Sequence, residues 1–556
     1  MPQPIARLRT VRAFTTLVMC LSISAAPRVA RAADWPMFLG NPSHTAISTE
    51  TLSVPMALEW KFKTIRYPNN PVSPVVVGKT VYLASQSNVY AVDAETGEQK
   101  WVYPAEGPIG APAAATIKAT PAVDGGLVFV GASDGVMYAL DADTGSLKWQ
   151  FQTKGHIRFS PIVVDGIVYF GSDDYKVYGV NAKTGKQAMT PVVTGSSIIG
   201  SPTYADGMLY FTSGDLNFYA ANSASGKVKY QIRLANSNVY ATPVATDRYI
   251  FTVGGNTLTS MTRGGGTRWS YVAHNPISDT PLVTPSAVYF GDKGGRLYAL
   301  DPKGNEKWSI TDNADRAMRF TDKPKKATSG ADPFLQLAGA LYSSPLLCGT
   351  NILVGTNRGF LYAIDAETGH VKWEYGVFSD LPAGSYTNIT SSPVVANGRL
   401  YVFSDDGALH CFTPTSMDAE KPKISNISPL RATEMNGTPP ILCGAIVSDE
   451  GSGIDAHSIK MSLDDKPLDF TFQPNSGWVY YKTVVTQPLE PLENGHHTVT
   501  LSVSDWKGNA ASESWSFTVD NTLAPSVVNT PAGTKKAPPT APGNAGFGAP
   551  PMPGMR

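Results

Sequence analysis

Four side chains that could bind an anion recur at one position of a repeated unit. Lys118, Arg158, Tyr240 and Tyr342 each lie two residues before a Ser/Thr-Pro pair and directly after an apolar residue. Because side chains alternate between the two faces of a strand, we expect these four to face a common opening. Two cations and two phenol groups could hold a small anionic ligand or an acidic segment of a partner protein. A hydrated rim without a ligand is the alternative.

Carboxylates that could do chemistry occur at two further places. Asp279 directly precedes one of the Ser/Thr-Pro pairs and could act as a base, but we favour a solvated turn carboxylate. Asp449, Asp455 and Asp505 could meet at one end of a C-terminal module and bind calcium, although turn capping is the favoured interpretation. We therefore assign no catalytic residue and no metal ligand.

The composition restricts the class of protein and of partner. Lys+Arg and Asp+Glu both number 45, so no net charge favours a nucleic acid or an anionic membrane surface. Only 16% of the 556 residues are charged, while Gly (51) and Pro (43) are frequent, which is typical of a turn-rich β protein. Cys348, Cys411 and Cys443 are spread over different segments, and we expect small buried apolar residues rather than disulfides.

An internal repeat must position the rim residues. The eleven-residue unit Ala139–Trp149 recurs at 91–101 and 363–373, and weaker copies bring the number to eight, as do the Ser/Thr-Pro pairs. In the second copy, short apolar runs at 120–123, 127–131, 136–140 and 149–151 are separated by turn residues, which predicts four antiparallel strands. Repeats of this kind build propellers or solenoids.

The repeated motif contains its own turn chemistry. Asp141 and Thr144 can accept hydrogen bonds from amides of the following turn, and Gly145 can adopt a left-handed conformation. Trp149 opens the outermost strand, where its ring could wedge between adjacent sheets. We expect each copy to form one blade.

The chain ends of the repeat predict a closed ring. Residues 58–62 read as an outermost strand without a motif before them, and the last copy at 409–412 stops before its own outermost strand. Pairing of the two would remove an open sheet edge, so we predict an all-β, eight-bladed β-propeller; a capped solenoid is the alternative. The long loops at 105–119, 311–340 and 376–390 belong to one face, and residues 311–336 are an inserted loop.

The unit Ala-x-Asp-x-x-Thr-Gly-x-x-x-Trp resembles the tryptophan-docking repeat of the pyrroloquinoline-quinone-like β-propeller superfamily. This superfamily includes quinoprotein alcohol dehydrogenases and BamB-type assembly scaffolds, and the opening residues 34–38 resemble the leader of its secreted members. The resemblance implies that a quinoprotein would carry adjacent cysteines and a calcium site beside a catalytic aspartate. The sequence has no Cys-Cys pair, so pyrroloquinoline quinone (PQQ) and calcium enter only as an alternative.

Four segments follow from these patterns. Residues 1–32 predict a signal peptide and 33–415 the propeller. Residues 424–521 contain new alternating runs and resemble immunoglobulin-like β-sandwich modules of bacterial surface proteins. The Pro-rich residues 522–556 predict a disordered tail. No segment after the signal is long and apolar enough to span a membrane.

The sequence thus predicts an exported, periplasmic or extracellular protein without catalytic activity. It would bind a protein or a small anionic ligand at the loop face of the propeller, in cell-envelope assembly or in a surface interaction. A PQQ-dependent dehydrogenase with a divergent site is the alternative. Adhesion to carbohydrate or to a cell surface through the second module is a third hypothesis.

Overall fold

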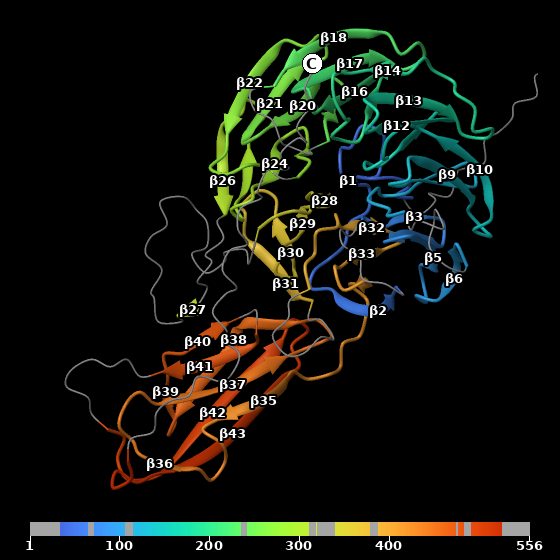
Figure 1. The fold of residues 1–556 in the computed structure, drawn as a ribbon. Helices are drawn as coiled ribbons and strands as arrows, with labels where there is room; N and C mark the ends of the chain where they lie inside the picture. Colours follow the sequence, from blue (N-terminus) through green and yellow to red (C-terminus); the bar gives the residue numbers. More distant parts are fainter. Residues whose placement is uncertain are drawn as a thin grey trace, which may run out of the picture.

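The computed structural model describes residues 34–64, 72–105, 115–234, 242–277, 279–310, 318–319, 340–377, 387–473, 476–482 and 491–524. Strands and turns make up these parts, which form a ring of sheets and a second, two-sheet module beside it (Figure 1). In the described residues, no helix has the length and apolar character of a membrane span. The predicted signal peptide and almost all of the predicted tail lie outside the described residues.

Eight sheets form the ring in the described part of the chain, one for each copy of the sequence repeat. Six contain four consecutive strands, ordered from the centre outward. Blades 1 to 3 are β3 (Val75–Val77), β4 (Thr80–Ser85), β5 (Asn88–Asp93), β6 (Gln99–Tyr103); β7 (Ala122–Asp124), β8 (Leu127–Gly131), β9 (Val136–Asp141), β10 (Leu147–Gln152); and β11 (Ile162–Val164), β12 (Ile167–Ser172), β13 (Lys176–Asn181), β14 (Val192–Val193). Blades 4 to 6 are β15 (Thr203–Ala205), β16 (Met208–Ser213), β17 (Asn217–Asn222), β18 (Val228–Arg233); β19 (Val244–Ala245), β20 (Tyr249–Gly254), β21 (Thr257–Thr262), β22 (Thr267–Val272); and β23 (Leu282–Val283), β24 (Val288–Gly291), β25 (Leu297–Leu300), β26 (Glu306–Ile310).

The last two blades take strands from the N-terminal segment. Blade 7 consists of β28 (Leu346–Cys348), β29 (Asn351–Gly355), β30 (Phe360–Asp365) and β31 (Val371–Gly376), with β1 (Ile47–Ser48) parallel to β28. Blade 8 consists of β32 (Val394–Ala396), β33 (Arg399–Phe403), β34 (Ala408–Thr413) and β2 (Ala57–Lys63).

Strand β2 closes the ring by pairing antiparallel with β34. Trp60 lies opposite Cys411, and Phe62 lies opposite Leu409. The sheet edge of blade 8 is thereby covered by a strand from the other end of the propeller. The predicted all-β propeller with an N-terminal closing strand is therefore confirmed.

The repeated motif docks each blade onto the next. Asp141 accepts hydrogen bonds from the amides of Asp143 and Thr144, as predicted. Gly145 has φ +70°, and a Cβ there would lie 2.7 Å from the ring of Trp101 on the preceding blade. Trp101 also donates its indole N–H to the carbonyl of Ala142 at 3.0 Å. Glycine is required because the indole ring covers the left-handed turn at contact distance.

The second module is a sandwich of two five-stranded sheets. One sheet consists of β35 (Lys423–Ser428), β37 (Leu442–Ser448), β41 (Trp478–Lys482), β40 (Thr471–Gln473) and β27 (Met318–Arg319). The other consists of β36 (Glu434–Met435), β43 (Ala510–Val519), β42 (Gly495–Asp505), β38 (Ile454–Leu463) and β39 (Lys466–Pro467). Apolar side chains of both sheets share one core. The resemblance to immunoglobulin-like modules stays a prediction.

Strand β27 comes from the predicted insertion of the propeller. Met318 and Arg319 pair antiparallel with Phe472 and Thr471 of β40, so two residues of the insertion extend a sheet of the second module. The rest of the predicted loop 311–336 lies outside the described residues.

The second module docks on blade 7 through a turn that matches the repeat motif. Residues 449–453 read Asp-Glu-Gly-Ser-Gly, the same Asp-x-x-Ser/Thr-Gly pattern as in the docking turns. Trp373 of β31 donates its indole N–H to the carbonyl of Ser452 at 3.2 Å, and the Tyr375 hydroxyl donates to the carbonyl of Glu450 at 2.9 Å. The second module thus supplies a docking turn where blade 8, which runs on through Pro414, has no such motif.

Candidate ligand site in the propeller channel

The eight Ser/Thr-Pro pairs form a closed ring of hydrogen bonds around the channel. In every blade, the hydroxyl oxygen accepts the backbone N–H of the equivalent residue in the preceding blade, at N···O distances of 2.9–3.3 Å. We call these eight hydroxyls the hydroxyl crown. Its members are Ser73, Thr120, Ser160, Ser201, Thr242, Thr280, Ser344 and Ser392. The bond from the Ser392 amide to the Ser73 hydroxyl joins the last blade to the first.

The crown hydroxyls are buried and have unused donor capacity. Their exposed fractions lie between 2% and 7%. A hydroxyl offers one O–H donor in addition to its acceptor lone pairs. Within the described residues, each crown hydroxyl accepts an amide N–H, and none donates its own hydrogen to a protein group. The eight O–H groups are therefore available to whatever occupies the channel.

The N-terminal segment, residues 35–48, crosses the channel below the crown. It forms backbone hydrogen bonds with inner strands of five blades. The partner positions lie three residues beyond the crown hydroxyl in each strand: Val76, Val123, Tyr204, Ala245 and Leu347. Three strand residues correspond to roughly 10 Å, so this segment lies on the side away from the loop face. It forms the floor of the channel.

A histidine anchors this segment in a dry environment. The Nδ1 atom of His44 lies 3.0 Å from the Thr203 hydroxyl, which itself donates to the carbonyl of Pro243 at 2.6 Å. The Thr203 oxygen must therefore accept from Nδ1–H, which fixes the tautomer of the neutral ring. Complete burial lowers the pKa of His44 to about 3, so the ring stays uncharged at neutral pH.

A cavity of about 210 Å³ lies between this floor and the loop face. All eight crown residues line it, together with Lys118, Arg158 and Tyr342. The structure thus brings three of the four predicted rim residues together, whereas Tyr240 lies outside the described residues. Phe38 of the N-terminal segment also lines the cavity. The volume is below the ~300–1,000 Å³ of sites for drug-sized ligands, so the space suits a small group.

The two cations differ in their partners. Arg158 forms an ion pair with Asp173, with 2.6 Å between Nε and Oδ2, and half of its side chain remains exposed. Lys118 is exposed and has no ion pair with any residue in the described ranges. Lys118 is therefore available to a ligand, while Arg158 is held in place by Asp173.

Asp279 is buried, and the favoured interpretation of a solvated turn carboxylate was wrong. The side chain is 3% exposed, lines the cavity, and both its oxygens lie 3.1–3.2 Å from the amide nitrogen of Gly291. Ser343 accepts the equivalent amide of Gly355 in the next blade. Asp279 thus accepts a backbone N–H at the position that Ser343 occupies in the next blade. Burial raises the pKa of Asp279 well above its ordinary value, which favours the protonated form.

An apolar layer behind the rim sets the direction of the rim side chains. Ile157, which precedes Arg158, is 1% exposed and packs against Gly131 of the preceding blade. The same contact joins Ile389 to Gly355 and Leu341 to Gly291. Since neighbouring side chains alternate, burial of the apolar residue turns the next side chain toward the channel.

Comparison with known proteins places this architecture in a family. A family model described as "Outer membrane protein assembly factor BamB" matches residues 57–197, 152–241, 193–328 and 240–434, which together cover more than half of the chain. The chain belongs to the BamB family. The match includes every blade and the closing strand, but it ends near the start of the second module.

Relatives of this BamB-family chain include assembly factors and quinoproteins. The outer membrane protein assembly factor BamB of Escherichia coli K12 is 26% identical over 157 residues, which are 25% of this chain and 37% of the relative. The dehydrogenase subunit of a quinone alcohol dehydrogenase from Komagataeibacter europaeus is 30% identical over 128 residues, or 22% of this chain and 15% of the relative. The chain thus aligns with well under half the length of these curated relatives.

Solved structures support the fold. The quinohemoprotein alcohol dehydrogenase of Comamonas testosteroni matches with a TM-score of 0.53 and 16% identity, over 73% of this chain and 84% of the other. This identity is too low to transfer an activity.

The described lining of this BamB-family channel does not fit the cofactor set that the resemblance implies. Cys348, Cys411 and Cys443 are free, buried in the sheets, and absent from the cavity lining, as expected for small apolar residues. Asp279 is the one carboxyl in the described lining, where it holds the Gly291 amide, and no Asn or Gln lines the cavity there. These residues provide neither a cysteine pair for a quinone nor a carboxylate and amide set for calcium.

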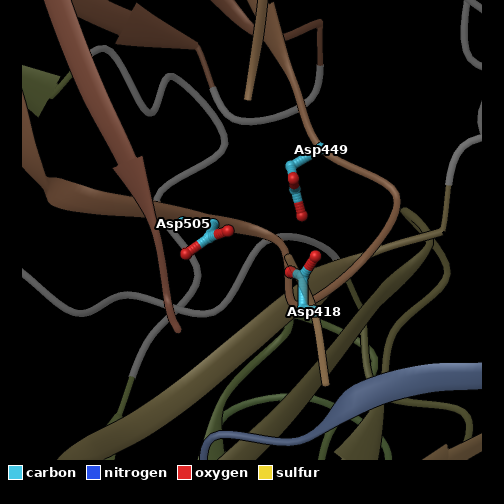
Figure 2. A group of neighbouring side chains, drawn as sticks. All are labelled: Asp418, Asp449 and Asp505. Carbon is cyan, nitrogen blue, oxygen red and sulfur yellow. The ribbon is translucent and has the colours of Figure 1, made fainter. Parts of the chain in front are cut away.

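A second group of chemistry-bearing residues lies at the joint with the second module. Figure 2 shows Asp418, Asp449 and Asp505, whose carboxylate oxygens lie within 4.8 Å of one another. Asp449 and Asp505, two of the three aspartates that could meet at this end of the module, do lie together, and the third member is Asp418 of the linker. Asp455 lies outside the cluster and accepts the backbone N–H of His457, whose ring it also contacts, in keeping with the favoured interpretation of turn capping.

Each carboxylate of this acidic cluster caps a turn. Asp449 accepts the amides of Gly451 and Gly453 at 3.0 and 2.8 Å, and Asp418 accepts the amide of Ser452 at 2.7 Å. Asp505 accepts the backbone and side-chain N–H groups of Asn509. Burial, and then the neighbouring Asp418 and Asp505, raises the pKa of Asp449 to about 6, against the opposing amide bonds. Turn capping, the favoured interpretation, is what these hydrogen bonds provide.

Replacement of Asp449 by asparagine should stabilise the chain at neutral pH. The folded-state pKa lies above the ordinary value of 3.8, so the folded state binds more protons and loses stability as pH rises from about 4 to 6. Asparagine keeps an acceptor for the Gly451 and Gly453 amides but carries no charge. We expect a gain of ~1 kcal/mol at pH 7.5, seen as a few degrees in thermal melts with EDTA, and little gain at pH 4.

Asp455→Asn is the matched control, because Asp455 lies outside the acidic cluster, and it should give no such pH-dependent gain. A loss of stability for Asp449→Asn at pH 7.5 would contradict the prediction. Stabilisation of the native chain by millimolar calcium, absent in Asp449→Asn, would assign the acidic cluster to a metal instead.

Proposed function

We propose that this chain is an exported, non-catalytic binding or scaffold protein of the cell envelope. Its site is the cavity at the loop face of the propeller, which takes an acidic segment of a partner protein or a small anionic ligand. The observation that carries the proposal is the convergence of Lys118 and Arg158 on one cavity that contains a ring of hydrogen-bond donors. The name of the E. coli relative, an outer membrane protein assembly factor, supports the envelope as the setting.

The electrostatics of the cavity favour an anion. In the described lining, Lys118 and Arg158 occur with one carboxyl, Asp279, whose raised pKa favours the neutral form; Asp173, which pairs with Arg158, does not line the cavity. A charge-assisted hydrogen bond from lysine or arginine to a carboxylate is roughly twice as strong as a neutral one. Arg158 is already oriented by Asp173, so little side-chain entropy is lost when it binds.

Exchange of both cations should abolish most of the binding. For Lys118→Ala combined with Arg158→Ala, we expect at least a ~10-fold lower affinity for a hexaglutamate peptide and for partners captured from envelope extract, because two charge-assisted bonds are lost. Titration calorimetry at low salt measures the peptide affinity. Lys154→Ala with Lys183→Ala serves as the control, since these exposed lysines do not line the cavity. Equal binding by the native chain and the cation variant would refute the proposal.

The quinoprotein relatives support one alternative, a PQQ-dependent dehydrogenase with a divergent site. Addition of PQQ and calcium to the purified chain, followed by dye reduction with a panel of alcohols and sugars, tests it. We expect no turnover, because the described lining provides no stacking cysteine pair and no free carboxylate. Turnover that depends on PQQ would replace the scaffold proposal.

A further inference from the structure

We propose that the hydroxyl crown is an oxyanion receptor, which holds the phosphate or carboxylate head of the ligand that enters the propeller channel. This inference rests on the proposed anionic site at the loop face. It specifies which side chains recognise the ligand and which chemical class the recognised part of the ligand belongs to.

The crown has donors that the protein itself does not use. Each hydroxyl oxygen accepts one amide N–H from the neighbouring blade, so its position is fixed and its O–H can turn toward the channel. The described residues offer these O–H groups no acceptor, although the side chains are at least nine-tenths buried. A buried donor without a partner costs ~1–3 kcal/mol, so an occupant of the cavity that accepts these O–H groups is favoured.

The backbone N–H groups next to the crown cannot act as donors to a ligand. The amide of each crown residue is already used within the ring of bonds, as the Thr120 amide is by Ser160. The next residue in every blade is proline, which has no N–H. The hydroxyls are therefore the donors at this level of the channel, and they come from all sides.

Charge decides between an anion and a cation as the occupant. Hydroxyl oxygens can also face a cation, but Lys118 and Arg158 line the same cavity and would repel one. The one described carboxyl of the lining, Asp279, is directed to the Gly291 amide, and burial raises its pKa, which disfavours its negative charge. An oxyanion accepts hydrogen bonds from the crown hydroxyls on one side and from Lys118 and Arg158 at the mouth of the cavity. The hydroxyls and the cations thus share one ligand.

The dimensions limit what reaches the crown. The cavity of about 210 Å³ ends at the N-terminal segment, where Phe38 contributes to its lining. This space admits a phosphate, a sulfate or the carboxylate head of a longer molecule. The remainder of such a molecule would lie at the loop face, beside Lys118 and Tyr342.

Calorimetric titration of the full chain with inorganic phosphate and with citrate, at constant ionic strength, tests the inference. We expect one phosphate per chain and a rise of the melting temperature. Thr120→Val with Thr280→Val keeps the side-chain shape and removes two crown hydroxyls, so affinity should fall ~10-fold or more. Thr120→Ser with Thr280→Ser retains both hydroxyls and should bind within about twofold of the native chain. Comparison of the citrate and phosphate affinities shows whether the crown prefers a carboxylate or a phosphate head.

The outcomes separate this inference from the proposed function. Native phosphate affinity in the valine variant, with weaker binding in the variant that lacks Lys118 and Arg158, would place the anion at the mouth and overturn the crown inference alone. Binding of hexaglutamate without binding of phosphate or citrate would do the same. Absence of binding for all three probes would overturn both proposals.

A second measurement covers the case in which the valine variant does not fold. Anomalous scattering from selenate soaked into crystals of the native chain locates the anion directly. A selenate within hydrogen-bond distance of the crown hydroxyls supports the inference. Selenate found only elsewhere, or nowhere, overturns it.

Discussion

Replacement of Trp373 by alanine should destabilise the chain by ~3–5 kcal/mol, the usual cost of truncating a fully buried tryptophan. Trp373 is 0% exposed, packs edge-on against Phe412 of blade 8, and donates to the carbonyl of Ser452 in the second module. One substitution therefore removes packing within the ring and one of the hydrogen bonds across the joint. Calorimetric unfolding and limited proteolysis of the linker around Asp418 measure the two effects.

Two further substitutions make the prediction specific. Trp373→Phe keeps most of the ring packing but loses the N–H donor, so it should cost ~1 kcal/mol and act mainly on the joint. Trp269→Ala removes a docking tryptophan of blade 5, which donates to the carbonyl of Pro302 in blade 6 and not to the second module. It should destabilise the propeller without increasing cleavage of the linker. Equal protease sensitivity of the linker in Trp373→Ala and Trp269→Ala would show that residue 373 has no special role in the joint.

Replacement of Gly131 by alanine should cost ~1–3 kcal/mol, because the new methyl group has no room. A Cβ at this position would lie 2.2 Å from Cγ2 of Ile157, which is itself fully buried in the next blade. Ile157→Ala alone should cost ~2–5 kcal/mol through the cavity that it leaves. The double substitution should cost less than the sum of the two, since the methyl group then occupies vacated space. Chemical denaturation of the four chains gives the coupling energy.

Gly264→Ala is the control for this series. Its Cβ would find its nearest neighbour at 3.9 Å, so the change should stay within ~0.5 kcal/mol of the native stability. Additive costs in the double-substitution cycle would contradict the packing of Ile157 on Gly131. The phosphate affinity of Gly131→Ala is a second measurement, because a displaced Ile157 would also move Arg158 at the rim.

The architecture of the propeller is readable from the sequence because its determinants are local and repeated. The Asp141-to-Gly145 turn and the docking tryptophans specify each blade within a few residues, and repetition makes the pattern visible even where single copies have decayed. The closing strand is predictable for a related reason. Residues 58–62 form an outermost strand without a blade of their own, and the blade that ends with 409–412 lacks its outermost strand. The structure pairs these two segments.

The hydroxyl crown is a feature that sequence patterns did not reveal. The Ser/Thr-Pro pairs served only to count the repeats, because each hydrogen bond joins residues on different blades, such as Thr120 and Ser160. The ring closes between Ser392 and Ser73. Only the circular arrangement shows that the hydroxyls share one axis. The signal was present in the strict preference for serine or threonine at these eight positions.

The acidic cluster and Asp279 show a different limit of sequence reasoning. Asp418 belongs to a short polar linker, and its place beside Asp449 depends on the path of the chain between two modules. Asp279 was judged as one polar residue at a turn, whereas its burial depends on the closure of the channel around it. Long-range packing determines both environments, and no local pattern encodes it.

The closing strand also has a consequence for the timing of folding. Ala57–Lys63 leaves the ribosome near the beginning of synthesis, but its partner Ala408–Thr413 is made only after seven blades are complete. The first strand must therefore wait as an unpaired nascent segment, whereas the preceding residues find their partners in blades 1, 2, 4, 5 and 7 as these are made. Any product that stops short of residue 413 retains an unsealed blade, which makes it a recognisable target for proteolysis.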